Sequence, residues 1–113
     1  MKTEIAVIGG GDSGIITAIT ARKSGKEVVI LERKDRILKK VLITGNGRCN
    51  ITNVNADISN YFGKNISSVE NILNSFNPQD TMDFFNGLGI VCNEENRGKV
   101  YPLNDAVDRK SVV

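Results

Sequence analysis

A glycine-rich turn between two apolar runs is the feature that most constrains what this chain can fold into. Ile5–Ile8 is continuously apolar and leads directly into Gly9–Gly14, which fits the spacing GxGxxG. Apolar residues then recur at helical spacing from Ser13 to Ser24, and a second apolar run follows at Val28–Leu31. Continuous apolar runs are typical of parallel strands buried on both faces. The order strand, helix, strand therefore predicts a βαβ unit over residues 1–35.

Each glycine of the turn has a physical role in binding a dinucleotide. Gly9 permits the tight turn, Gly11 lets the backbone approach a pyrophosphate, and Gly14 allows the helix to pack closely on the strand. The helix N-terminus offers unpaired N–H groups and a partial positive charge to the phosphates. Ser13 adds a hydroxyl donor, and we expect the Asp12 carboxylate to point away from the anion. The turn thus predicts binding of an ADP moiety.

Glu32 closes the second apolar run, where a carboxylate accepts hydrogen bonds from the ribose hydroxyls of an adenosine. The same negative charge repels a 2′-phosphate, which disfavours NADP. It does not separate NAD from FAD, because neither carries that phosphate.

Residues 36–66 form a basic, glycine-rich loop region with a possible short strand at Val41–Ile43. Within it, Gly45 and Gly47 let the backbone pass close to a ligand. The cations that can offset diphosphate charge are Lys39, Lys40 and Arg48. The neutral groups suited to a flavin or ribityl chain are Asn50, Thr52 and Asn53. A polar turn held by local side-chain-to-backbone bonds is the alternative interpretation.

Residues 67–113 are predicted to form helices and a β-hairpin. One helix begins at Ser67 or Ser68, and a second begins at Asn77, which is followed by Pro78 at the first helical position. Ile90–Cys92 and Lys99–Tyr101 are the predicted hairpin strands. A last helix is expected from Asn104 or Asp105.

Composition limits the remaining possibilities. The chain has 113 residues, a net charge of +2 and no histidine. Such a balanced charge predicts no nucleic-acid partner, and the absence of a long apolar stretch or signal peptide predicts a cytoplasmic protein with no membrane contact. Without histidine, His-based nucleophilic catalysis and His-ligated metal sites are excluded from these residues. Cys49 and Cys92 form no CxxC pair, so we expect reduced thiols, no metal site, and chemistry supplied by a cofactor.

The run Leu42–Asn53, which reads Leu-Ile-Thr-Gly-Asn-Gly-Arg-Cys-Asn-Ile-Thr-Asn, resembles the signature of BaiN-like or aminoacetone-oxidase-like NAD(P)/FAD-dependent oxidoreductases. The resemblance continues to Gly98–Pro102 and implies a Rossmann-like α/β fold that binds FAD, with NAD(P)H as a possible electron donor. It also implies a chain several times longer, with an inserted substrate domain. Residues 1–113 would then be the N-terminal part of an incomplete FAD-binding domain, not competent for catalysis alone.

Taken together, motif and resemblance predict the FAD-binding portion of a flavin-dependent oxidoreductase that acts on a small molecule. The predicted cofactor-binding residues are Gly9, Gly11, Asp12, Ser13, Gly14, Glu32, Arg33, Lys40, Thr44, Gly45, Gly47, Arg48, Cys49 and Asn50. No catalytic residue is assigned. We also expect self-association through exposed sheet edges.

Three alternatives remain open. The first is a non-catalytic fragment that binds only ADP or a dinucleotide. The second is an NAD-binding Rossmann dehydrogenase domain, which residues 44–53 disfavour because such a domain does not need them. The third is a flavin-dependent tRNA-modifying enzyme, which the near-neutral charge disfavours.

Overall fold

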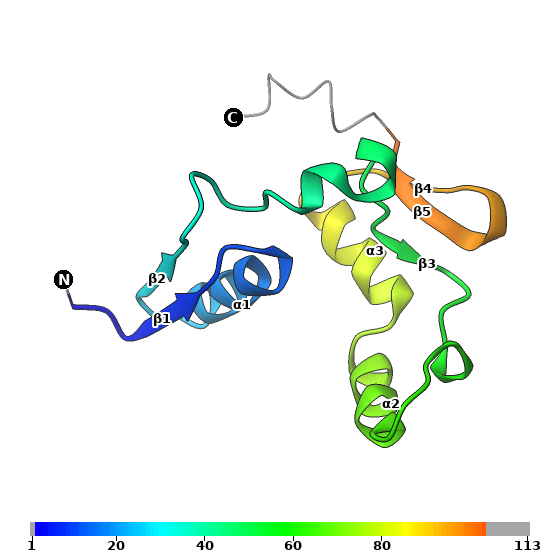
Figure 1. Cartoon of the computed structure of the whole chain (residues 1–113), viewed down its shortest axis with the longest axis horizontal. Helices are drawn as coiled ribbons and strands as arrows, with labels where there is room; N and C mark the ends of the chain where they lie inside the picture. The colour runs from blue at the N-terminus through cyan, green and yellow to red at the C-terminus, as the bar shows by residue number, and fades with distance from the viewer. Residues whose placement is uncertain (1, 104–113) are drawn as a thin grey trace. The chain divides into compact units, whose positions relative to one another are not determined.

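The computed structural model describes residues 2–103 of the chain (Figure 1). The chain divides into two compact units, Met1–Thr44 and Gly45–Val113. The first unit holds a two-stranded parallel sheet and a helix, and the second holds a three-stranded antiparallel sheet with helices. The α/β class expected from the sequence is therefore observed.

The first unit contains the predicted βαβ arrangement. Strand β1 (Ile5–Ile8) leads through the glycine turn into helix α1 (Asp12–Lys23), and β2 (Val28–Leu31) pairs with β1 in parallel. Helix α1 ends at Lys23, and Gly25, two residues beyond, takes a left-handed φ of 82°, a conformation that commonly follows a helix C-terminus. Burial of Val7 and Ala18 between strand and helix forms the core of this unit.

Helix α1 covers only one face of this sheet, because α1 is the single helix between the two strands. Ile8 is 79% exposed and Leu31 is 52% exposed, although both belong to the continuous apolar runs. The continuous apolar runs predict a sheet that is buried on both faces. Within this unit, only the face that packs against α1 is buried.

In the second unit, the strands β3 (Thr52–Asn53), β4 (Cys92–Glu94) and β5 (Lys99–Pro102) lie in the order β3-β5-β4 and are all antiparallel (Figure 1). The predicted hairpin is confirmed, although its first strand begins at Cys92. Val100, in the central strand, is completely buried. β3 was not predicted, because two polar residues carry no strand pattern.

Helices α2 (Ile66–Ser75) and α3 (Pro78–Gly87) connect β3 to the hairpin, and α3 packs against β3 and β4. The predicted start of α3 is confirmed by a capping box. The Asp80 N–H donates to the Asn77 side chain at 2.9 Å, and the Asn77 N–H donates to the Asp80 carboxylate at 2.9 Å. These bonds satisfy N–H groups that the helix itself leaves unpaired.

The predicted short strand at Val41–Ile43 is wrong. This segment begins a 3₁₀ helix, η1 (Val41–Gly47), in which the Ile43 N–H donates to the Lys40 carbonyl at 3.2 Å. Three apolar residues are too few to distinguish strand from helix. Two further 3₁₀ turns, η2 (Ile58–Asn60) and η3 (Asn96–Gly98), lie in segments expected to be loops. The helix expected from Asn104 or Asp105 lies outside the described residues.

The capping box predicts different costs for two asparagines at helix N-termini. Asn77→Ala removes a cap with reciprocal bonds and should lower the free energy of unfolding by about 1 kcal/mol. Asn65→Ala, at the start of α2, removes a side chain that makes no cap hydrogen bond and should cost less. Urea unfolding of both variants tests this, and equal losses would contradict it.

The exposed apolar face of the first sheet leads us to propose self-association. Light scattering of the chain should show an apparent mass that rises with concentration, and Ile8→Thr should reduce the rise. Ile72→Thr, at a 66% exposed position on α2, is the matched control and should leave it unchanged. A monodisperse monomer at all concentrations would refute the proposal.

Candidate dinucleotide-binding site

The glycine turn lies at the carboxyl end of β1 and is tied to the neighbouring strand. Gly9 has a left-handed φ of 102°, and its N–H donates to the Leu31 carbonyl at 2.8 Å. A Cβ added at Gly14 would lie 2.0 Å from the Gly9 carbonyl oxygen, so only glycine lets the helix approach the strand this closely. A Cβ at Gly11 would meet no atom within 4 Å, which leaves open space beside the backbone there.

Position 10 also requires glycine, which the sequence motif did not predict. Its N–H donates to the Glu32 carboxylate at 2.7 Å, and its carbonyl accepts from the Leu38 N–H at 2.7 Å. A Cβ at Gly10 would lie 2.7 Å from the Ile37 side chain. The run of three consecutive glycines was the available signal, because the GxGxxG spacing alone leaves this position free.

Glu32 is held by backbone N–H groups at both oxygens. Lys34 donates to Oε1 at 2.8 Å, and Gly10 donates to Oε2 at 2.7 Å. These two hydrogen bonds, with smaller contributions from Arg33, hold the pKa of Glu32 below its usual value despite some desolvation. Each carboxylate oxygen keeps a second lone pair, so Glu32 can still accept a bond from a ribose hydroxyl.

The start of α1 presents donors to solvent. Among the described residues, no acceptor pairs with the N–H groups of Gly11, Asp12 and Gly14. The Ser13 N–H instead donates to the Asp12 carboxylate at 3.0 Å, so Asp12 occupies one donor of the first turn. Three N–H groups and the helix dipole therefore remain available to an anion.

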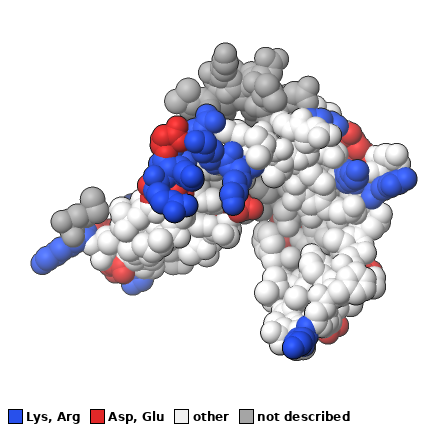
Figure 2. All heavy atoms as spheres, in the orientation of Figure 1, with Lys and Arg blue, Asp and Glu red and all other residues white. Residues whose placement is uncertain are grey.

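A basic segment follows β2. In Figure 2, Lys and Arg side chains gather over the loop between β2 and η1, with acidic groups among them. Lys39 pairs with Asp35 at 3.0 Å, whereas Arg33 and Lys40 are exposed and form no ion pair within the described residues. Thr44 is also exposed and donates its hydroxyl to the Val41 carbonyl at 2.8 Å.

The segment from Gly45 onward belongs to the second unit. Gly45, Asn46 and Gly47 all have left-handed φ angles, at 56°, 56° and 82°. A Cβ at Gly45 would lie 2.7 Å from the Asn50 N atom, so the turn closes tightly on itself. Cys49 is also left-handed, with a φ of 61°. Left-handed residues other than glycine are uncommon and cluster at functional sites.

Arg48 has protein partners. Its guanidinium forms a bidentate ion pair with Glu95, with one N–O distance of 2.9 Å, and lies 4.3 Å from the Tyr101 ring centroid. Hydrogen bonds from this guanidinium lower the pKa of Glu95. The sequence assigns Arg48 to a diphosphate, but here its charge is balanced by Glu95, a partner distant in sequence.

The remaining polar residues of this segment stabilise the second unit. The Asn50 amide, oriented to satisfy its neighbours, donates to the Thr52 and Val100 carbonyls at 2.9 and 3.2 Å. Cys49 and Cys92 are free thiols, and burial raises the pKa of Cys92. In the part of the chain described, no three His, Cys, Asp or Glu side chains form a metal-binding group.

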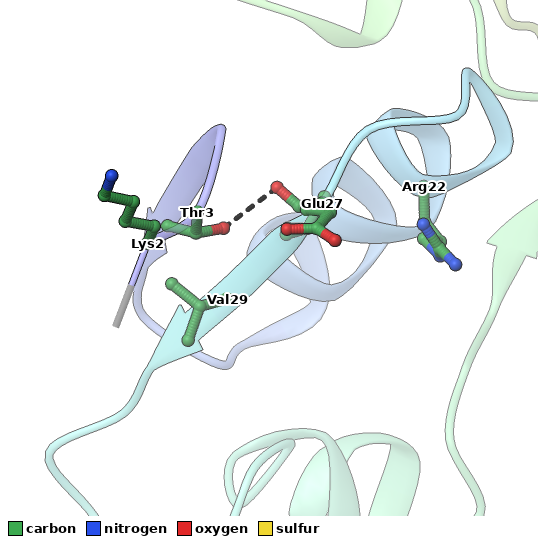
Figure 3. Close-up of a pocket in the computed structure, with 6 residues that line it drawn as sticks. Lys2, Thr3, Arg22, Glu27 and Val29 are labelled. Carbon is green, nitrogen blue, oxygen red and sulfur yellow. Dashed lines mark hydrogen bonds between the residues drawn. The ribbon is translucent and has the colours of Figure 1, made fainter.

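A hollow of about 370 Å³ lies at the other end of the first unit (Figure 3). Lys2, Thr3, Arg22, Glu27 and Val29 surround it, and the Thr3 hydroxyl donates to the Glu27 carbonyl at 2.9 Å. Its residues precede or begin the strands, whereas parallel α/β sheets bind ligands at the carboxyl ends. The glycine turn, not this hollow, is therefore the candidate site.

The parallel βαβ unit and its glycine turn define a Rossmann-type dinucleotide-binding domain. The chain belongs to the HI0933-like protein Rossmann domain family, which it matches over residues 3–111.

No helix within residues 2–103 is long and apolar enough to cross a membrane.

Curated relatives place the chain beside redox enzymes. It is 45% identical over 103 residues to the 3-dehydro-bile acid delta(4,6)-reductase of Clostridium scindens, covering 89% of this chain and 25% of the relative. It is 28% identical over 100 residues to the ribosomal RNA dihydrouridine synthase of Escherichia coli, covering 88% and 25%. The Haemophilus influenzae enzyme of that name is also 28% identical, over 99 residues, with 88% and 25% coverage. The chain thus spans about a quarter of their length.

The lowered pKa of Glu32 predicts a pH dependence of stability. A depressed folded pKa contributes stability above the ordinary value of 4.5, and this is lost as the pH falls through the folded pKa. Glu32→Gln should therefore be less stable than wild type at neutral pH, and the difference should narrow below about pH 4.5. Thermal unfolding across pH measures it. Glu70→Gln, which removes a carboxylate at an exposed position on α2, is the matched control for the loss of one negative charge.

Proposed function

We propose that this chain supplies the ADP-binding part of an FAD-dependent oxidoreductase. The observation that carries the proposal is the glycine turn, where open space beside Gly11 adjoins unpaired N–H groups at the start of α1. Glu32 lies against the same turn, through its bond to Gly10. These features give a diphosphate and an adenosine ribose adjacent contacts.

The residues of the turn fit the ADP half of a dinucleotide. The N–H groups of Gly11, Asp12 and Gly14 would hold the diphosphate, and Glu32 would accept from the ribose. Arg33 and Lys40, on the basic loop, would add positive charge. When bound, FAD supplies hydride and electron transfer, which none of these side chains can perform. The protein's part is therefore to bind and orient the cofactor.

FAD is favoured over NAD by the segment that follows the βαβ unit. Residues 42–53 resemble the BaiN-like flavoprotein signature, and an NAD-binding domain has no need of it. The tight left-handed turn at Gly45–Gly47 and the strained backbone of Cys49 support a ligand-facing role for this segment.

The relatives support reductive chemistry. One relative is named a reductase and another a dihydrouridine synthase, and both names describe products that carry added hydrogen. Hydride chemistry of this kind is supplied by a nicotinamide or flavin cofactor and not by side chains. We propose that NAD(P)H is the donor and that the complete enzyme acts on a small molecule.

The test is titration of the purified chain with FAD, followed by quenching of flavin fluorescence, with NAD and ADP as competitors. Saturable FAD binding that is much tighter than that of NAD or ADP, so that either competitor displaces FAD only in large excess, would support a flavoprotein site. Equal, weak binding of FAD, NAD and ADP would refute the flavin-specific proposal and leave a non-catalytic ADP-binding module.

Gly11→Ala tests whether the open space beside the turn receives the ligand. The added Cβ meets no protein atom, so the melting temperature should not fall, while FAD affinity should drop about tenfold, equivalent to ~1.4 kcal/mol. Gly87→Ala, at the end of α3, also adds a Cβ that meets nothing within 4 Å and should leave affinity unchanged. Unaltered affinity in Gly11→Ala would place the diphosphate elsewhere.

A further inference from the structure

A hollow with several polar side chains in its lining lies in the second unit, beside the tip of the β4–β5 hairpin. Its volume is about 460 Å³, which falls within the range of small-molecule pockets. β3, the turn that follows it, η2 and the hairpin tip contribute the lining residues (Figure 1). These residues are Asn53, Asn55, Ala56, Asn60, Tyr61 and Arg97.

The lining carries one positive charge and no carboxylate. Among the described residues, the Arg97 guanidinium, the Asn55 amide nitrogen and the Tyr61 hydroxyl make no hydrogen bond or ion pair. The Asn60 amide oxygen accepts from the Asp57 N–H at 2.8 Å, which leaves its amide nitrogen as a donor. A cation surrounded by neutral donors is the chemistry that binds an oxyanion.

The acidic groups closest in sequence to the lining residues already have partners within the protein. The Asp57 carboxylate accepts from the Ser59 N–H at 2.7 Å and from the Ser59 hydroxyl, and these bonds lower its pKa. Glu95, two residues before Arg97, is paired with Arg48. Neither carboxylate lines the hollow. Glu95 and Arg97 both line a smaller neighbouring hollow of about 220 Å³, where the Glu95 carboxylate is held by its ion pair with Arg48.

Arg97 has a backbone conformation that is unfavourable for an arginine. Arg97 has φ 61° and ψ 28°, a left-handed conformation that favours glycine or asparagine. The Asn53 amide donates to the Arg97 carbonyl at 3.0 Å. The next residue, Gly98, is buried, and a Cβ there would lie 2.5 Å from the Asn55 amide nitrogen. Asn53 and Asn55 therefore pack directly on the hairpin tip and fix the position of the Arg97 backbone.

We propose that this hollow binds the oxyanion of a small organic molecule, with Arg97 as the charged contact and Asn55 and Asn60 as neutral donors. The Tyr61 ring, 42% exposed, offers a flat surface to the organic part of the ligand. A phosphate ester and a carboxylate share the required chemistry. All of its lining residues belong to the second unit.

The test is NMR titration of the ¹⁵N-labelled full chain, without FAD, using phenyl phosphate, benzoate and inorganic phosphate as separate probes. Saturable shifts of the Asn55 and Asn60 side-chain amides and of the Gly98 N–H are expected with at least one ring-bearing probe. Whichever of phenyl phosphate and benzoate binds with the higher affinity identifies the preferred oxyanion. Absence of saturable shifts with all three probes would overturn the proposal.

Arg97→Asn separates binding from folding, because asparagine tolerates the left-handed conformation. We expect about tenfold weaker binding or worse, the loss of ~1.4 kcal/mol or more, with no fall in melting temperature. Lys99→Gln removes a neighbouring cation that does not line the hollow and should leave the affinity unchanged. Undiminished binding in Arg97→Asn, or an equal loss in Lys99→Gln, would overturn the assignment.

Discussion

The hydrogen bond from the Gly10 N–H to the Glu32 carboxylate is the interaction on which the first unit's site depends. It joins the turn after β1 to the residue after β2, so the backbone of the glycine turn and the Glu32 carboxylate have one fixed arrangement. The Leu38 N–H, which donates to the Gly10 carbonyl, continues the same connection into the basic loop. A single glycine thereby links three segments that the sequence separates.

The second unit is organised differently, around β5. Val100 is its fully buried centre, and both neighbouring strands pair with this strand. Tyr101, the next residue along β5, lies against the Arg48 guanidinium, and Glu95 completes that pair. The polar segment that resembles a flavoprotein signature is thus anchored to the hairpin by charge and by an aromatic face.

The sequence predicted the βαβ unit and the start of α3 because their signals are local: apolar periodicity, a glycine turn and a capping asparagine. It missed β3, because two polar residues take strand form only when a partner strand is present. It also missed the pairing of Arg48 with Glu95, since residues 47 positions apart meet only through tertiary structure. The requirement at Gly10 depended on Ile37 and Glu32, whose positions no local pattern gives.

The glycines of the turn are constrained by different agents, and this has an evolutionary consequence. At Gly10 and Gly14 the protein itself excludes a side chain, whereas at Gly11 protein atoms leave the space open. Selection for folding alone would therefore preserve the first two and release the third. In a descendant that no longer bound a nucleotide, Gly11 should be substituted before Gly10 or Gly14. The order of substitution would then indicate that ligand binding had been lost while the fold was kept.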